Sequence, residues 1–358
     1  MLTQIGRYWA PIADGRLECQ LCPRLCRLKE GQRGMCFVRM RQDNAIVLDT
    51  YGRSSGFCID PIEKKPLNHF YPGTPVLSFG TAGCNLACKF CQNHDMSKSR
   101  ETDILTEQAS PQQLANVAAA NNIKSIAYTY NDPVIFLEYA VDIAKACRKK
   151  GIKSVAVTAG YIEPEPRIEF FDHMDAANVD LKAFTEEFYF KLTGAHLQPV
   201  LDTLEYLIHH TDVWVEITTL LIPGSNDSAK EIKKMSEWIC TKLSPDVPLH
   251  FTAFHPDFRM LDTPPTPIET LLKARHIAKE TGLKHVYIGN AHHKAAQSSY
   301  CQGCGACVIG RDWHALSEWG LTDFGACITC GTLFPGRIAG PPGNWGRKRQ
   351  KVRIANSE

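Results

Sequence analysis

The chain has 358 residues and a formal net charge of +2 at pH 7, and 44% of its residues are hydrophobic. This length suits one barrel-sized domain with small appendages, and the small net charge excludes a global field that would draw the protein to nucleic acid or to an anionic membrane. The sequence has no apolar run of about 18 residues, so no membrane span is expected. The N-terminus lacks the charged-then-apolar pattern of a signal peptide, which makes the cytoplasm the expected location.

Fifteen cysteines in a reducing compartment favour metal binding over disulfides. Most of these cysteines fall into three groups along the chain. Two others, Cys147 and Cys240, lie in helical patterns and are expected to be small buried hydrophobic residues. The role of Cys58 is left open.

The first group has C-x2-C-x3-C spacing and one further cysteine, and consists of Cys19, Cys22, Cys26 and Cys36. Four thiolates close a metal site, so we expect this group to be structural or electron-transferring and not catalytic. The spacing does not separate zinc from a [4Fe–4S] cluster, and both remain open. We assign residues 1–74 to an N-terminal Cys-rich metal-binding module with its lead-in.

Residues 75–295 alternate short β-rich runs with longer helical ones. Strands are expected at 76–79, 125–129, 154–157, 176–181, 213–221, 249–254 and 285–288. Helices are expected after the N-cap Ser110, from about 134, and at 197–209, 229–243 and 267–281. Repeated β-then-α units with apolar strands predict a parallel sheet covered by helices, and seven or eight strands favour a full or partial (β/α) TIM-like barrel.

Three cysteines follow the first of these strands at C-x3-C-x2-C spacing: Cys84, Cys88 and Cys91. Three thiolates on one loop can hold three corners of a [4Fe–4S] cluster and leave the fourth iron open to a small molecule. Active sites of such barrels lie at the carboxyl ends of the strands, where this loop is expected. The alternative is a zinc site or a closed electron-transfer cluster with a fourth ligand elsewhere.

The third group forms two C-x2-C knuckles with the ligands Cys301, Cys304, Cys327 and Cys330. This pattern predicts a zinc ribbon over residues 296–336, and an iron–sulfur cluster is the alternative because Cys307 is surplus. Residues 337–358 are rich in Gly and Pro and then basic. They are expected to form a flexible, solvated tail, with a nucleic-acid contact as the alternative.

The run from Gly83 to Asn93 resembles the signature of radical S-adenosylmethionine (SAM) enzymes. Its flanking residues resemble those of the glycyl-radical-enzyme activases, such as pyruvate formate-lyase activating enzyme. The closer resemblance is to the radical SAM member of the AmmeMemoRadiSam system, through the segments Asp60–Leu67, Tyr128–Pro133 and Val179–Lys182. It covers nearly the whole chain, including both terminal modules.

This resemblance implies an oxidoreductase reaction. SAM would chelate the open iron through its amino and carboxylate groups, and one electron from the reduced cluster would cleave its sulfonium–carbon bond. The products would be methionine and a 5′-deoxyadenosyl radical, which abstracts hydrogen from a protein or small-molecule substrate. The implied electron donor is a reduced protein of the flavodoxin or ferredoxin type.

The resemblance also implies that a tripeptide after the second strand binds SAM. Tyr130, Asn131 and Asp132 occupy the place of the family's Gly-Gly-Glu motif, which holds the SAM amino group. Asp132 is shorter than the usual Glu, and it also fits a helix N-cap before Pro133.

Further SAM contacts are implied at later strand ends. Asp180 and Lys182 resemble the activases' Asp-x-Lys motif, although these two lumen-facing charges could instead satisfy each other. His255 follows a strand where related activases carry a SAM-contacting histidine, and an ordinary loop role is its alternative. Thr158 lies where activases have Asp-Thr-Asn-Gly, with Val157 in place of the Asp, so a cation site on that carboxylate lacks its ligand.

Glu216 interrupts an otherwise apolar strand. A buried carboxylate must be paired or protonated. Glu216 is therefore expected either to line the active site, near the SAM ribose, or to pair with a lumen lysine such as Lys182.

Three functions remain open at this point. An activase would place a glycyl radical on a glycyl radical enzyme. A radical enzyme of another kind would modify a protein or a small molecule, with Memo-like or Amme-like proteins as partners. A non-catalytic iron–sulfur and zinc scaffold would bind RNA or a protein. The cysteine pattern favours an enzyme, but the residues do not identify its substrate.

Overall fold

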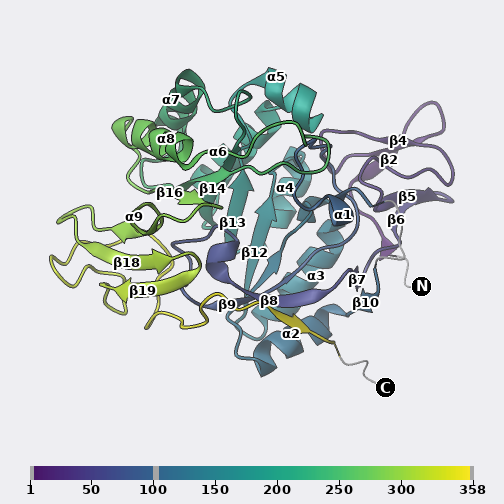
Figure 1. Ribbon diagram of the computed structural model, residues 1–358. Helices are drawn as coiled ribbons and strands as arrows, with labels where there is room; N and C mark the ends of the chain where they lie inside the picture. Colours follow the sequence, from purple (N-terminus) through teal and green to yellow (C-terminus); the bar gives the residue numbers. More distant parts are fainter. Residues whose placement is uncertain (1–3, 100–104, 355–358) are drawn as a thin grey trace.

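A nine-stranded sheet forms the centre of the protein in the computed structural model, which describes residues 4–99 and 105–354 (Figure 1). The strand order is β16-β15-β14-β13-β12-β11-β9-β8-β20, and the strands from β16 to β9 in this order pair in parallel. The parallel strands are β9 (Pro75–Phe79), β11 (Ser125–Tyr128), β12 (Lys153–Thr158), β13 (Ala176–Asp180), β14 (Trp214–Leu221), β15 (Leu249–Ala253) and β16 (Val286–Gly289). All of the expected strands are present, and the barrel is partial.

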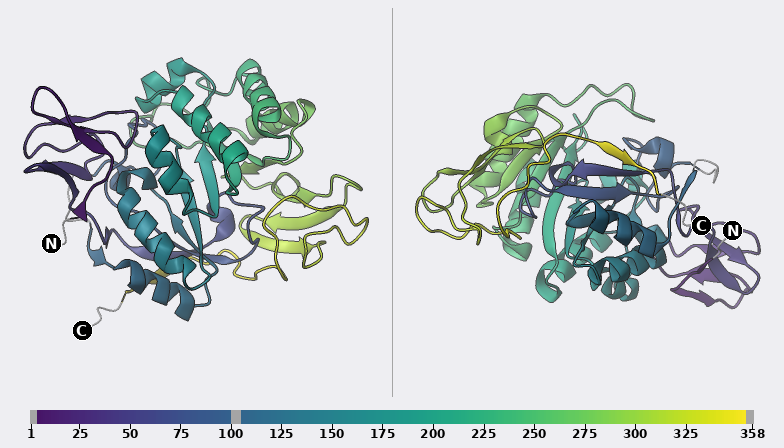
Figure 2. Two further views of the ribbon diagram at one scale, coloured as in Figure 1. Left: turned by 180° about the vertical axis from the view of Figure 1, so that it is seen from behind. Right: turned by 90° about the horizontal axis from the view of Figure 1, so that it is seen from below.

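Helices cover the outer face of this sheet (Figures 1 and 2). They are α2 (Pro111–Ala120), α3 (Leu137–Arg148), α4 (Pro164–Phe171), α6 (Gln198–His210), α7 (Ala229–Trp238) and α8 (Ile268–Glu280). Shorter helical segments are η1 (Ile62–Lys64), α1 (His94–Ser97), η3 (Pro133–Phe136), α5 (Glu186–Phe188), η4 (Tyr189–Thr193), η5 (Ile239–Leu243) and α9 (Lys294–Gln297). Ser110 accepts a hydrogen bond from the backbone N–H of Gln113, which confirms the predicted N-cap of α2. None of the helices in residues 4–99 and 105–354 has the length and apolar character needed to cross a membrane.

The strands present alternate residues to two different cores. Leu77 of β9 belongs to the main core under the helices, whereas Val76 packs with Ile62 and Phe70 in a second core. The segment around Ile62–Phe70 therefore fills the inner face of the sheet toward the amino ends of the strands. We refer to residues 62–70 as the inner plug.

The inner plug follows β8 (Phe57–Pro61), which pairs antiparallel with β9. Within the range that we assigned to the N-terminal module and its lead-in, β8 therefore joins the sheet of the barrel. A strand that pairs with the sheet over long range has no local signature that would separate it from the module before it.

The basic tail also departs from the sequence-based expectation. Strand β20 (Gln350–Val352) pairs antiparallel with β8, and the backbone N–H of Gly343 donates to the Pro72 carbonyl at 2.9 Å. The described part of the tail, up to residue 354, thus lies on the barrel and is not a free end; residues 355–358 lie outside the described residues. Strand β20 covers the edge of β8, which would otherwise expose unpaired backbone groups.

The two Cys-rich modules lie on opposite sides of the barrel (Figures 1 and 2). The N-terminal module has two small sheets, formed by β1 (Gln4–Ile5), β5 (Arg39–Gln42) and β6 (Ala45–Leu48), and by β2 (Trp9–Pro11), β3 (Leu17–Cys19) and β4 (Arg27–Leu28). The C-terminal module has one, formed by β17 (Ser299–Tyr300), β18 (Cys307–Asp312) and β19 (Ala315–Trp319). A separate two-stranded pair joins β7 (Arg53–Ser54) to β10 (Glu107–Gln108).

A buried ion pair fastens the N-terminal module to the barrel. Arg39 of β5 donates from Nη2 to both carboxylate oxygens of Glu138 in α3, at 2.6 Å each, and the two side chains are 1% and 2% exposed. The backbone N–H of Arg7 donates to the same carboxylate at 2.6 Å. Since an isolated charge is costly at this depth, the pair ties the module to α3.

We expect Glu138→Ala to lower the free energy of unfolding by about 3–5 kcal/mol, because it leaves the Arg39 guanidinium buried and unpaired. Denaturant-induced unfolding of Glu138→Ala and of a control variant measures the change in the free energy of unfolding. Glu187→Ala is the matched control, because Glu187 pairs with Lys191 on the surface, where both side chains are largely exposed. Equal midpoints for the two variants would show that the buried pair does not fasten the module.

Candidate functional site

The loop that carries Cys84, Cys88 and Cys91 begins just after the carboxyl end of β9, as predicted. The backbone N–H of Ala87 donates to the carbonyl of Thr193 at 2.8 Å, which holds the loop against the chain that follows β13. The three cysteines therefore lie at the end of the barrel where βα loops build active sites.

Gly83 lets this loop approach the N-terminal module. Its φ angle is +85°, in the left-handed region that favours glycine. A Cβ atom on Gly83 would lie 1.9 Å from the carbonyl oxygen of Cys36, so no side chain fits there. The cysteine loop and the segment that carries Cys36 are thus in backbone contact.

Cys88 is buried and Cys84 is half-buried, and both thiols lie near lysine side chains. Burial raises the pKa of Cys88 to about 12, against the opposing effect of Lys182 and Lys98. Burial also raises the pKa of Cys84, and Lys98 again opposes it. Thiolates at these positions therefore need more positive charge than the two lysines supply, which bound iron would provide.

The spread of the three thiols fits a cluster better than a single ion. Within the described residues, the only set of three or more His, Cys, Asp or Glu ligand atoms that all lie within 4.8 Å of one another belongs to the C-terminal cysteines, so the loop cysteines do not form such a set. In a [4Fe–4S] cluster each cysteine binds a different iron, which places the sulfur atoms farther apart than around one ion.

Asn131 connects the loop to the end of β11. Its Nδ2 donates to the Gly83 carbonyl at 2.8 Å, and its Oδ1 accepts from the backbone N–H of Thr81 at 3.2 Å. Asn131 thus holds both ends of the turn that leads into Cys84.

Asp132 joins the ends of β11 and β12. Its Oδ1 accepts from the Val134 backbone N–H at 3.1 Å and from the Thr158 hydroxyl at 2.9 Å, and its Oδ2 accepts from the Ala159 backbone N–H at 2.9 Å. The N-cap interpretation is therefore confirmed. Burial raises the pKa of this carboxyl, although the three hydrogen bonds oppose the shift.

Asp180 and Lys182 form an ion pair at the end of β13, with Nζ and Oδ2 2.9 Å apart. Lys182 Nζ also lies 6.0 Å from the ring centre of Phe90, which is on the cysteine loop. Burial would lower the pKa of Lys182, but Asp180 and the Cys88 thiolate outweigh burial and raise it above its usual range. The two residues thus pair with each other and also face the cysteine loop.

His255 lies beside the same loop, just after β15. Its Nδ1 is 2.8 Å from Nε2 of Gln92, the residue that follows Cys91. The side chain is 58% exposed, which leaves it accessible at the rim of the site.

Tyr130 joins a different group, which sequence reasoning missed. Its hydroxyl donates to Asp60 at 2.7 Å and lies 2.8 Å from Cys58 Sγ, while Lys65 Nζ is 2.7 Å from the same Asp60 oxygen. Burial would raise the pKa of Asp60, but Lys65 and the other donors hold it below its usual range. The segment Asp60–Leu67 could have pointed to this group, because it carries part of the resemblance to the AmmeMemoRadiSam radical SAM member. From the sequence, that segment had no assigned chemical role.

This group faces the inner side of the sheet. Cys58 of β8 lies directly opposite Ser78 of β9, and Ser78 shares a face with Val76 of the second core. The thiol that was left open from the sequence therefore lies on the concave side of the barrel, next to the tyrosine that precedes Asn131.

Glu216 does not belong to the site. Its carboxylate accepts from the backbone N–H groups of Asn68 and His69 at 2.9 and 2.7 Å, and lies 2.7 Å from His250 Nε2. It therefore fixes the inner plug toward the amino ends of the strands. Neither sequence-based expectation holds, because the pairing with Lys182 is absent and the residue is remote from the strand ends that carry the cysteine loop.

Comparison with known proteins agrees with this geometry: residues 79–239 match the Radical SAM superfamily. The chain belongs to the radical SAM superfamily. An uncharacterized protein of Methanocaldococcus jannaschii is 40% identical to it over 304 residues, which cover 85% of this chain and 90% of that protein. The pyruvate formate-lyase-activating enzyme of Clostridium pasteurianum is 26% identical over 170 residues, which cover 47% of this chain and 70% of that enzyme.

Among solved structures, a domain of the pyruvate-formate lyase-activating enzyme of Bacteroides vulgatus has a TM-score of 0.41 at 20% identity, over 46% of this chain and 98% of that one. Membership of the radical SAM superfamily makes the protein an enzyme and implies a [4Fe–4S] cluster and SAM as its cofactors. The thiols of Cys84, Cys88 and Cys91 are the residues that fit the cluster.

The C-terminal cysteines of this radical SAM protein form a different kind of set. The four ligand sulfurs lie within 4.8 Å of one another, with 3.5 Å between Cys301 and Cys330 and 3.8 Å between Cys304 and Cys327. Tetrahedral zinc with Zn–S bonds of about 2.3 Å places its sulfurs about 3.8 Å apart. The set therefore fits one tetrahedral ion, and Cys307 is not part of it.

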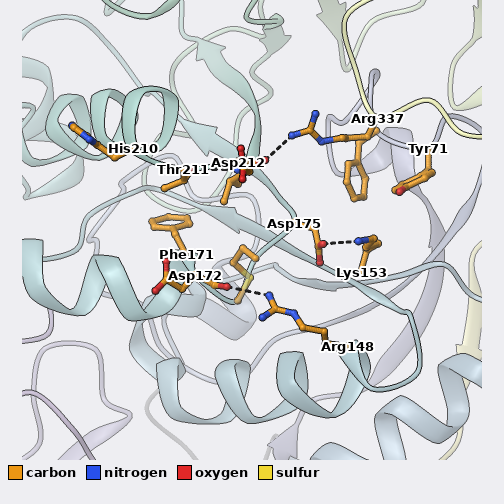
Figure 3. Close-up of a pocket in the computed structure, with 13 residues that line it drawn as sticks. Tyr71, Arg148, Lys153, Phe171, Asp172, Asp175, His210, Thr211, Asp212 and Arg337 are labelled. Carbon is orange, nitrogen blue, oxygen red and sulfur yellow. Dashed lines mark hydrogen bonds and ion pairs between the residues drawn. The ribbon is translucent and has the colours of Figure 1, made fainter. Parts of the chain in front are cut away.

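Figure 3 shows a pocket at the opposite end of the barrel. The amino ends of β12 and β13 contribute Lys153 and Asp175, which pair at 2.9 Å, and Arg337 donates to the Asp212 carbonyl at 2.6 Å. Arg148 donates to the Asp172 carbonyl at 3.0 Å, and the lining of the pocket includes no cysteine. The residues that the sequence predicts for catalysis lie at the other end, with the cysteine loop.

We expect Gly83→Ala to destabilise the protein strongly and to prevent cluster incorporation, because the new Cβ would overlap the Cys36 carbonyl. Gly15→Ala is the matched control, since Gly15 has a φ of +79° but no atom within 4 Å of the position of the added Cβ. The control should cost only about 1 kcal/mol of backbone strain. Thermal unfolding and iron content after reconstitution measure both effects, and similar values for the two variants would exclude the close approach.

For the C-terminal set, we expect Cys304→Ala to abolish zinc binding and Cys307→Ala to retain it. Acidification from about pH 8 to about pH 5 should release the ion, because protons compete with it for the thiolates. The contact with Thr332 lowers the pKa of Cys330 to about 6, which favours the thiolate form that a metal ion binds. Elemental analysis of the dialysed proteins measures the metal, and zinc loss from Cys307→Ala would contradict the assignment.

Proposed function

We propose that this enzyme cleaves SAM reductively at a [4Fe–4S] cluster held by Cys84, Cys88 and Cys91. The 5′-deoxyadenosyl radical formed would abstract hydrogen from a protein or small-molecule substrate. The observation that carries the proposal is the cysteine loop itself, with its three separated thiols at the carboxyl end of β9 and Lys182 beside them. An iron without a protein ligand is what SAM needs in order to bind the cluster directly.

The charges around the loop suit the polar groups of SAM. Lys182 is held positive by Asp180 and faces the loop, so it would attract the SAM carboxylate. Asp132 Oδ2 has one described donor and can accept another, which suits the SAM amino group. His255 is accessible next to Gln92 and would contact SAM at the rim.

The other predicted residues would shape the site or orient its groups. Asn131 shapes the turn into Cys84, and Thr158 orients the Asp132 carboxylate through its hydroxyl. Tyr130 lies with Cys58 and Asp60 on the concave side of the sheet, where a substrate would meet the radical.

Similarity to proteins named as pyruvate formate-lyase-activating enzymes supports a protein substrate. The partner in that case would be a glycyl radical enzyme, while the resemblance to the AmmeMemoRadiSam system favours a Memo-like or Amme-like protein. A glycyl-radical doublet in the EPR spectrum of the partner would separate the first from the second. We further propose a flavodoxin- or ferredoxin-type electron donor and a cytoplasmic location, where the fifteen free thiols would stay reduced.

The test is anaerobic SAM cleavage. The protein is reconstituted with iron and sulfide and reduced with dithionite, and 5′-deoxyadenosine is quantified after SAM is added. We expect product from the parent and from Cys240→Ala, whose thiol lies in η5 outside the loop, and only background from Cys88→Ala.

Two results would contradict the proposal. One is equal product from Cys88→Ala and from the parent. The other is a parent that carries an intact cluster by EPR, shows no spectral change on adding SAM, and forms no 5′-deoxyadenosine with any of the candidate partner proteins present.

A further inference from the structure

The N-terminal cysteines surround a common point in the module that faces the cysteine loop. Cys19 ends β3, and the backbone N–H of Cys19 donates to the Cys26 carbonyl at 2.9 Å, which closes the turn that carries Cys22. With Cys36, the four thiols line one small hollow. We call these four residues the N-terminal quartet.

The sulfur atoms of the quartet do not lie as close to one another as the four sulfurs of a zinc site would. The C-terminal cysteines have the same number and type of ligand, and they alone, within the described chain, bring their sulfurs within 4.8 Å of one another. A Cβ atom on Gly34 would lie 3.7 Å from Sγ of both Cys26 and Cys36, so both sulfurs border the same space beside Gly34. Sulfurs kept apart around a shared space fit four irons better than one ion.

Two arginines border this space. Arg24 and Arg39 line the same hollow as the quartet. Arg24 donates from Nε to the Asn85 carbonyl at 2.9 Å, but its Nη2 is buried and has no hydrogen-bond partner among the described residues. A buried donor without a partner is costly. Arg24 therefore joins the segment of the quartet to the cysteine loop and still carries one donor without a partner among the described residues.

The quartet also touches the catalytic loop. The Cys36 carbonyl packs against Gly83, and Asn85, which follows Cys84, lines the quartet's hollow. The buried pair between Arg39 and Glu138 keeps this arrangement rigid. The quartet and the cysteine loop are therefore neighbours with a fixed separation, which a structural zinc site would not require.

We propose that Cys19, Cys22, Cys26 and Cys36 ligate a second [4Fe–4S] cluster, which passes one electron to the cluster of the catalytic loop. The assignment of the relay rests on the function proposed above. A reduced low-potential protein of the flavodoxin or ferredoxin type loses one electron to the second cluster. That cluster is reoxidised as it reduces the first, and the same electron cleaves the sulfur–carbon bond of SAM to give methionine and the 5′-deoxyadenosyl radical. Each SAM cleaved therefore consumes one electron from the donor.

The metal content tests the cluster without any activity measurement. In the variant Cys84→Ala/Cys88→Ala/Cys91→Ala, the catalytic cluster is removed, and we expect half of the parent's iron to remain with the EPR signal of a reduced [4Fe–4S] cluster. Adding Cys22→Ala and Cys26→Ala should remove the rest, whereas adding Cys240→Ala should not. A triple variant that holds zinc or no metal at the quartet, with an unchanged thermal unfolding midpoint, would overturn the assignment.

The relay is tested by comparing two reductants. For Cys22→Ala/Cys26→Ala, we expect slower SAM cleavage than in the parent when a reduced ferredoxin supplies electrons, and an equal rate with dithionite, which is small enough to reach the catalytic cluster directly. Equal rates with both reductants would overturn the relay. A parent with two clusters that never cleaves SAM would instead contradict the proposed function and leave the second cluster standing.

Discussion

A charge inside this barrel is stable only where another group pairs with it, and this constraint decides which polar residues surround the cysteine loop. Asp180 and Lys182 pair at the carboxyl end of β13, so they present a mixed charge to the loop. Glu216 pairs with His250 near the other end and takes the inner plug as its further partner. Each pair stabilises its own layer of the barrel, since removal of one partner would leave an isolated buried charge.

The sequence predicted the positions of the strands and of the cysteine loop well, but it predicted the partners of the buried charged residues poorly. Apolar runs located every parallel strand, and the cysteine spacing located the loop at the end of β9. The apolar run around Glu216 predicted a buried carboxylate that must be paired or protonated, but it could not identify the partners, because these come from residues 148 and 147 positions away in the chain. The face of the sheet to which a strand residue belongs follows from local periodicity, whereas the partner of a buried charge depends on tertiary packing.

The same distinction explains the tail and the strand before the barrel. Gly and Pro in residues 337–358 resemble a flexible end in composition, yet Gly343 packs so closely on Gly73 that a Cβ would lie 2.2 Å from its carbonyl. The glycines permit contact between two backbones, and the edge of β8 supplies the partner for β20. Composition alone does not distinguish glycines that allow close contact between two backbones from glycines that make a segment flexible.

The two sets of four cysteines differ in the spacing of their sulfurs, because the hydrophobic cores around them differ. The small core of the C-terminal module includes Cys301 and Cys327, two of the four cysteines whose sulfurs gather, so an ion bound there would supply much of the module's folding energy. The N-terminal quartet packs into the main core, which continues through Leu21 and Phe90 into the barrel. The barrel fixes the positions of those sulfurs, and a site of fixed width beside a catalytic loop suits electron transfer better than it suits structural support.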